Sequence, residues 1–228
     1  MVIKNYKRDY DAYQKVINGK SLSLTDFLYF ASKLPFNLME GILRNIPGPL
    51  GYKLRYYFYK PFMKHLGKGV MIDIGVKLGG LRNLSISDYS WIDSYCIITS
   101  FLDDIEIGKR VHVAPFSIIH ANKKITIGDY AGISSGVKVF SSTSIPNNKR
   151  ISGPTIPREM ASLRTGPITI GKDSVIYTNT LVLPGTNIGE GAIVHANSII
   201  FGKVKPYDIV SGHNKVVGKR KKVTVKDI

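Results

Sequence analysis

The most regular pattern in the sequence is an aliphatic residue at every sixth position. A period of six fits neither the turn of about 3.6 residues in an α-helix nor the two-residue alternation of a flat strand. It predicts short strands separated by tight corners. The recurring positions are Ile86, Ile92 and Ile98, then Ile107, Val113 and Ile119, then Ile127, Ile133 and Val139, and finally Ile170, Ile176, Val182, Ile188, Val194 and Ile200.

The residues around these aliphatics suggest how the strands are arranged. Small residues stand two positions before many of them, as at Ala131, Ser174, Thr180, Ala192 and Ser198, and glycine follows several, as at Gly108, Gly128, Gly171 and Gly189. One aliphatic and one small residue would point inward on each face, and Gly or Asn would relieve the backbone at the corners. Three such faces make a coil of about eighteen residues, and coils stack as parallel strands roughly 4.8 Å apart. The repeats therefore predict a parallel β-helix rather than a β-sandwich, which does not keep one phase for so long.

The chain before the repeats follows a different pattern. Residues 1–20 are polar and predict a helix or a loose arm, whereas residues 21–64 carry apolar residues at helical spacing. Ser23 or Thr25 could cap the first helix of this stretch, Pro35 is expected to interrupt it, and residues 47–49 (PGP) form a break. Aromatic and basic residues then interleave over residues 53–64.

Two interpretations of this N-terminal region stay open. It could be a helical cap, because a solenoid cannot leave the core of its first coil exposed. It could also be a membrane-associating segment, with aromatics at the headgroup level and Lys and Arg on anionic lipid. The predicted organisation is residues 1–66 as the helical region, 67–217 as the β-helix with a long loop at 140–166, and 218–228 as a basic tail.

Composition and charge limit the location of the chain and the kinds of molecule that it is expected to bind. It has 228 residues, 43% hydrophobic and 21% charged, and no stretch apolar enough for a spanning helix. The start lacks the apolar core of a secretory signal, and the single Cys96 excludes an internal disulfide framework, so a cytoplasmic location is expected. Lys and Arg number 32 against 16 Asp and Glu, a net charge of +16 that attracts phosphates. No nucleic-acid-binding module accompanies that charge, so no nucleic-acid partner is expected.

Residues 67–217 resemble the hexapeptide-repeat acyltransferases, enzymes built on a left-handed parallel β-helix. Residues 125–130 (ITIGDY), 142–143 (ST) and 154–157 (PTIP) resemble the sugar O-acetyltransferases of surface-polysaccharide biosynthesis, and residues 169–192 with LPG at 183–185 resemble their late coils. The resemblance implies the handedness, a homotrimer, a sugar or glycan acceptor, and acetyl-CoA as the co-substrate, with its pantetheine arm between neighbouring subunits.

Acyl transfer to a hydroxyl needs a general base, and histidine is the usual one. In many members of the family this histidine lies on the loop after a sequence like residues 135–139, which places it at Ser144 here, so the chain departs from the pattern. Counting in steps of six puts His120 at the corner below the long loop. Stacked corners are neighbours, so His120 is expected above Asp103 and Asp104, one of which could orient its ring. His112 is the alternative, pointing outward from a flat face.

The remaining site predictions concern the co-substrate and metals. Lys203, Lys215, Lys219 and Arg220 lie in the late coils and tail, where the resemblance places the phosphates of an acyl-CoA. No metal is expected, since His112 and His120 do not have the spacing of a three-histidine zinc site. The predicted function is an acetyl-CoA-dependent O-acetyltransferase acting on a sugar hydroxyl in glycan biosynthesis. The alternatives are N-acetylation of an amino-sugar nucleotide and a non-catalytic trimeric scaffold that binds membrane or protein partners.

Overall fold

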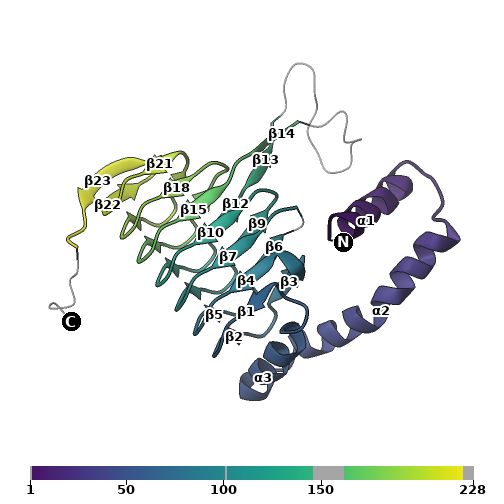
Figure 1. Ribbon diagram of the computed structural model, residues 1–228. Helices are drawn as coiled ribbons and strands as arrows, with labels where there is room; N and C mark the ends of the chain where they lie inside the picture. Colours follow the sequence, from purple (N-terminus) through teal and green to yellow (C-terminus); the bar gives the residue numbers. More distant parts are fainter. Residues whose placement is uncertain (1, 101, 146–161, 223–228) are drawn as a thin grey trace.

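Three helices lead into a stack of parallel coils, which Figure 1 shows in side view. The computed structural model describes residues 2–100, 102–145 and 162–222. The helices are α1 (Val2–Ile17), α2 (Leu24–Arg44) and α3 (Gly48–Tyr59), and a short 3-10 helix spans Leu81–Asn83. The rest is a left-handed parallel β-helix with three flat faces, confirming the predicted architecture.

Each face is one sheet whose strands come from successive coils. The first face contains β1 (His65–Leu66), β4 (Leu84–Ile86), β7 (Ile105–Ile107), β10 (Ile125–Ile127), β15 (Ile168–Ile170), β18 (Asn187–Ile188) and β21 (Lys203–Val204). The second contains β2 (Met71–Ile72), β5 (Trp91–Ile92), β8 (His112–Val113), β11 (Gly132–Ile133), β16 (Val175–Ile176), β19 (Ile193–Val194), β22 (Asp208–Ser211) and β23 (Lys215–Lys219). The third contains β3 (Lys77–Gly79), β6 (Ile97–Ser100), β9 (Ile118–Ala121), β12 (Lys138–Phe140), β17 (Leu181–Val182) and β20 (Ile199–Ile200).

The six-residue period marks the side chains that fill the interior. Ile127 pairs with Ile107 on one side and Ile170 on the other, and Val139 pairs in the same way with Ile119 and Val182. All the recurring aliphatics are buried, and so are the predicted small residues before them. The interior is therefore a set of columns in which branched aliphatic side chains stack on their equivalents.

The glycines that follow the inward aliphatics are required by the close approach of the next coil. A Cβ added to Gly108 would lie 2.5 Å from the Asp129 carboxylate, and one added to Gly171 would lie 2.5 Å from the backbone nitrogen of Glu190. The left-handed corner positions are not restricted to Gly and Asn as expected. Tyr95 and Phe116 adopt φ of 60° and 63°, and their rings stack in parallel 5.5 Å apart on successive coils.

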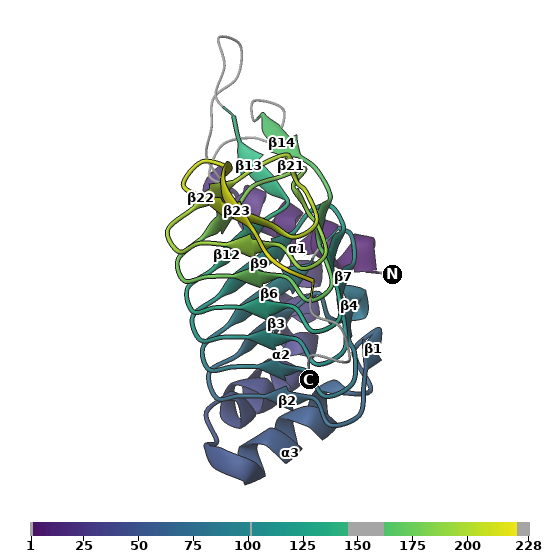
Figure 2. The same ribbon diagram turned by 90° about the vertical axis from the view of Figure 1, so that its left-hand side faces the viewer.

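The long excursion after β12 does not disturb the stacking of the coils. Its two ends pair as an antiparallel ribbon of β13 (Ser142–Ser144) and β14 (Leu163–Thr165), which projects from one corner in Figure 2. On either side of it β10 pairs directly with β15, and β12 pairs directly with β17. Residues 146–161, which include the PTIP run, lie outside the described residues.

The helical region begins as expected and breaks between α2 and α3 near residues 47–49, but it does not break at Pro35. Ser23 caps α2, and its hydroxyl and backbone N–H form a reciprocal capping box with Asp26. Pro35 lies within α2, so the predicted interruption is wrong. A proline removes one backbone hydrogen bond, but its φ of about −65° suits a helix, and the bonds on either side hold the helix together.

A buried arginine joins the helices to the first coil. The guanidinium of Arg55 donates to the carbonyl oxygens of Leu43 and Ile46 at the end of α2, and to that of Ile72 in β2, at 2.7–2.9 Å. It thereby adds a charged donor to carbonyl oxygens at the end of α2, where the regular helical hydrogen bonds stop. Tyr59 extends from α3 into the same buried core as Ile72, so α3 covers the open end of the first coil.

The strands extend slightly beyond the predicted limits of the β-helix at both ends. β1 starts at His65, and β23 continues to Lys219 as the antiparallel partner of β22. Residues 223–228 of the predicted tail lie outside the described residues.

We expect Arg55→Ala to destabilise the protein by at least about 3 kcal/mol, because three buried carbonyl oxygens lose a charged donor. For a chain of this size that corresponds to a fall in the melting temperature of roughly 6–12 °C. Circular dichroism during heating measures the effect. Lys53→Ala, at an exposed position on the same helix, is the control and should melt like the wild type, and equal melting of all three proteins would contradict the role of Arg55 as the link.

Candidate functional site

His120 lies on the third face at the point where the long excursion leaves the β-helix. In β9 it pairs with Thr99 of the coil on one side and with Phe140 of the coil on the other. Its neighbours in the strand, Ile119 and Ala121, are buried, so the ring of His120 points outward and is itself only partly buried. Its Nδ1 lies 2.8 Å from the Thr99 hydroxyl oxygen.

The surroundings of His120 favour its neutral form. Burial lowers the pKa of its ring below the ordinary value of about 6.5. When Nδ1 carries the hydrogen and donates it to Thr99 Oγ1, Nε2 holds the lone pair and can accept a proton. Chemically, a neutral ring held in this tautomer can accept a proton at Nε2 near neutral pH.

Backbone and hydroxyl hydrogen bonds hold the root of the excursion against His120. The N–H of Ser141 donates to the carbonyl oxygen of His120 at 3.1 Å, and the Ser141 hydroxyl accepts from the N–H groups of Asn122 and Lys123 at 2.8 and 2.9 Å. The Asn122 side chain donates to the Ser142 hydroxyl at 2.8 Å. Ser144, where the family pattern places a histidine, is exposed at the end of β13.

The structure places Thr99, rather than Asp103 or Asp104, at Nδ1 of His120. The Asp104 carboxylate accepts from Lys64 Nζ at 2.6 Å, and the Asp103 carboxylate accepts from the Asp104 N–H at 2.8 Å. The reason is that β6 and β9 continue past their inward isoleucines, so His120 belongs to a strand and not to the corner. Its partner is thus set by backbone register, and the aspartates follow only after Ser100.

His112 lies on the second face and has the carboxylate partner that His120 was expected to have. Its exposed ring stacks on Trp91 at 4.7 Å, and its Nε2 lies 3.2 Å from the Asp93 carboxylate. Gly132 occupies the equivalent position in the next coil and leaves the face open there. Reasoning from the sequence missed Trp91 and Asp93, because the early coils are longer than eighteen residues. Pairing His112 with the aromatic residue one long coil earlier would have found Trp91.

The four predicted phosphate-binding residues fall into two groups. Lys219 forms an ion pair with the buried Asp208, and Arg220 bonds to the carboxylate of Asp173 at 3.0 Å and to its carbonyl oxygen at 2.7 Å. These two side chains fasten β23 to the late coils. Lys203 on β21 and Lys215 on β23 are exposed and point to solvent.

Three further observations concern metal binding, Cys96 and membrane-spanning helices in the described part of the chain. Within residues 2–100, 102–145 and 162–222, no group of three or more His, Cys, Asp and Glu side chains could hold a metal ion. Cys96 is buried as predicted, and burial raises the pKa of its thiol to about 12, so it is not a nucleophile. Of the helices described, none combines the length and hydropathy needed to cross a bilayer.

Comparison with known proteins finds sugar acyltransferases, although no family model matches the chain. The dTDP-4-amino-4,6-dideoxy-D-glucose acyltransferase of Escherichia coli is 34% identical over 137 residues, which cover 60% of this chain and 71% of that protein. The putative lipopolysaccharide biosynthesis O-acetyl transferase WbbJ of E. coli K12 is 31% identical over 114 residues, covering 49% and 55%. Among solved structures, AntD, an N-acyltransferase from Bacillus cereus in complex with dTDP and 3-hydroxybutyryl-CoA, superposes with a TM-score of 0.68 and 25% identity, covering 73% of this chain and 88% of AntD.

We expect His120 to titrate below the ordinary histidine value of about 6.5 in the folded protein, because burial disfavours the imidazolium. Proton–carbon correlation spectra of histidine-labelled protein recorded against pH measure this, with His120→Gln identifying the signal. The same residue should return to the ordinary value in urea. A folded-state pKa above that value would contradict the assignment of His120 as a neutral base.

Proposed function

Because the chain belongs to the hexapeptide-repeat acyltransferases that act on sugars, we propose that it transfers an acetyl group from acetyl-CoA to a sugar hydroxyl during glycan assembly. The observation that carries the proposal is His120, a partly buried histidine with a lowered pKa, bonded to Thr99 at the root of a long surface excursion. A base for acyl transfer has to be neutral at the working pH and within reach of an acceptor.

The proposed reaction uses His120 twice. Its Nε2 takes the proton of the sugar hydroxyl as the oxygen attacks the carbonyl carbon of the thioester. The tetrahedral intermediate then collapses, the C–S bond breaks, and the leaving thiolate of CoA takes the proton back from the imidazolium. Thr99 is a positioning residue in this scheme, because it fixes the tautomer that leaves Nε2 basic.

N-acylation of an amino-sugar nucleotide is the second candidate, and the AntD and dTDP-amino-sugar enzymes favour it. The two reactions place different demands on the base. A sugar hydroxyl is a poor nucleophile until its proton is removed, whereas a neutral amine attacks with its own lone pair and loses its proton afterwards. Loss of the histidine base should therefore lower turnover more for a hydroxyl acceptor than for an amine acceptor.

His112 is the second candidate for the base, because Asp93 lies at its Nε2 and Trp91 holds its ring. A carboxylate at one ring nitrogen orients an imidazole and stabilises its protonated form, which is the arrangement of catalytic triads. In a homotrimer the open second face could meet a neighbouring subunit, and the acceptor would then lie between the two. Asp103 and Asp104 stay within this proposal only as charges at the corner that follows β6.

The donor site is proposed at the late coils, with the phosphates of acetyl-CoA near Lys203 and Lys215. Both side chains are exposed cations, and a phosphate gains from each a Coulomb attraction that salt screens. Lys219 and Arg220 hold β23 in place, so they contribute to this site by fixing its backbone rather than by contacting the phosphates.

We expect His120→Ala to lower kcat by roughly a hundredfold or more, the usual effect of losing a positioned base, with little change in the Kd for CoA. His112→Ala is the matched control and should be mild. In the pH–rate profile of the wild type, the fall in kcat on the acid side should lie below pH 6.5. The reason is that burial lowers the pKa of His120 and the neutral form is the active one. Steady-state turnover with sugar and amino-sugar acceptors measures kcat and its pH dependence, and calorimetry measures the Kd for CoA. Loss of turnover in His112→Ala with activity retained in His120→Ala would assign the base to the His112–Asp93 pair.

We expect Lys203→Ala/Lys215→Ala to weaken CoA binding about three- to tenfold, since each exposed cation contributes a modest, screened attraction. Calorimetry at two salt concentrations measures the change, which should shrink as salt rises. Lys77→Ala/Lys109→Ala removes the same charge from the early coils and should bind CoA like the wild type. If neither the wild type nor the variants bind CoA, the chain is the non-catalytic scaffold.

A further inference from the structure

The polarity of α2 is inverted relative to that of an ordinary surface helix. Its charged residues face the rest of the chain, where Asp26 pairs with Lys15, Lys33 pairs with Asp9, and Glu40 accepts from the Tyr59 hydroxyl. Its other side is apolar along the whole helix, at the three- and four-residue spacing of a single face. The residues of this face, here called the α2 apolar face, are between 48% and 73% exposed: Leu24, Phe27, Leu28, Leu34, Leu38, Met39 and Ile42.

The next helix, α3, also exposes apolar residues, and lysines accompany them. α3 exposes Leu50, Leu54 and Tyr57, and Lys53 and Lys60 lie at the same helical spacing among them. Between Glu40 and Asp73 the chain contains no aspartate or glutamate at all, although it contains Arg44, Lys53, Arg55, Lys60, Lys64 and Lys68. Exposed leucines flanked by lysine and tyrosine are typical of helices that lie at the surface of a bilayer.

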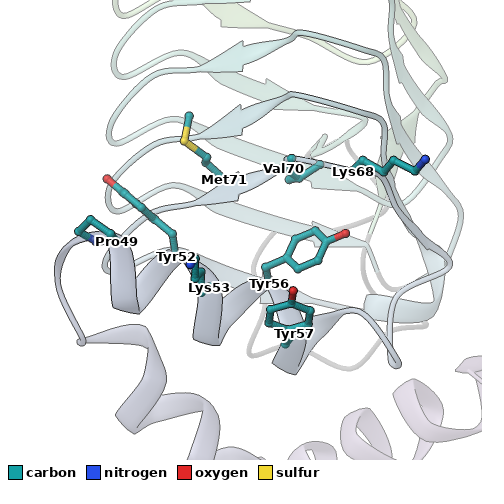
Figure 3. Close-up of a pocket in the computed structure, with 9 residues that line it drawn as sticks. Pro49, Tyr52, Lys53, Tyr56, Tyr57, Lys68, Val70 and Met71 are labelled. Atoms are coloured by element: carbon teal, nitrogen blue, oxygen red, sulfur yellow. The ribbon is translucent and has the colours of Figure 1, made fainter.

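A cavity of about 450 Å³ lies between α3 and the first coil. Figure 3 shows Tyr52, Tyr56 and Tyr57 rising from α3 toward Val70 and Met71 of the coil, and Lys53 and Lys68 also line this space. Its wall is thus mainly apolar and phenolic, and Lys53 and Lys68 are the charged residues that border it. Such a lining fits the phosphate of a lipid headgroup together with the first part of its acyl chains. Lys53 and Tyr57 belong both to this cavity and to the exposed side of α3.

Charge decides between a bilayer and a second copy of the chain as the occupant of this surface. The chain carries +16, and a second copy would bring the same sign against a segment that has no carboxylate of its own. An anionic bilayer brings the opposite sign and an apolar interior for the leucines and phenylalanines. We propose that the α2 apolar face docks the protein on an anionic lipid bilayer together with Lys53 of α3 and Lys60 at its C-cap, with a lipid headgroup in the α3 cavity.

Flotation of the full chain with lipid vesicles tests the proposal. Wild-type protein should bind vesicles containing a quarter phosphatidylglycerol, bind pure phosphatidylcholine vesicles much less, and be released in part by added salt. Leu28→Ser/Leu38→Ser should weaken binding about tenfold or more, because two side chains that enter the bilayer become polar. Lys53→Gln/Lys60→Gln should remove most of the preference for phosphatidylglycerol.

The controls separate docking from folding, assembly and catalysis. Val216→Ser/Val217→Ser changes two exposed valines of β23 and should float like the wild type. Both serine variants should keep the wild-type melting curve, the mass measured by light scattering, and turnover of a soluble acceptor. Absence of wild-type binding to the anionic vesicles would overturn the proposal, as would full binding by Leu28→Ser/Leu38→Ser. A fall in mass for that variant, together with no vesicle binding by the wild type, would assign the face to contacts between copies. Vesicle binding and mass can both be measured whether or not the chain is an acetyltransferase, so failure of this proposal is distinct from failure of the proposed function.

Discussion

The parallel pairing of each coil with the next is the interaction on which everything else in this molecule depends. The backbone hydrogen bonds between coils fix the register, and the register puts branched aliphatics on branched aliphatics inside the solenoid. The same register also stacks the outward side chains. Thr99, His120 and Phe140 form one outward column, and Trp91 and His112 form another. Both candidate sites are therefore products of coil stacking, and neither depends on a loop for the placement of its histidine.

Several cationic side chains have a structural role in this chain. Arg55 is buried beneath the first coil and binds three carbonyl oxygens, while Lys219 and Arg220 fasten the last strand to Asp208 and Asp173. Each end of a solenoid has unpaired backbone and an open core, so these cations stand where the repeat stops. The positive charge that remains for ligands and lipids is therefore smaller than the composition suggests, and it lies on exposed lysines along the length of the chain.

Periodicity predicts the inside of a solenoid much better than its outside. All the aliphatics that the six-residue step marked are inward, because burial in a column demands one type of side chain, whereas the outward positions are under no such demand. The step did not mark the second inward aliphatic of the first face, as at Ile105, Ile125 and Ile168. Whether His120 belonged to a corner or to a strand depended on how far β9 continues past Ile119, and the step carries no information on strand length. Thr99 was missed for that reason, whereas Asp93 was missed because the early coils are longer than eighteen residues. Likewise, the apolar spacing of α2 predicted a helix, but only the packing of α1 on its charged side shows which side faces outward.

The pairing of β10 with β15 across the excursion has a consequence for how such a protein can evolve. The chain leaves at Ser144 and returns at Leu163 on adjacent strands, so the number of residues between them is invisible to the coils on either side. Lengthening a loop whose ends are already joined costs little conformational entropy. Residues can thus be inserted, deleted or exchanged beside His120 without changing how the coils pair. A lineage could therefore change this one segment while the coils of its solenoid stay the same.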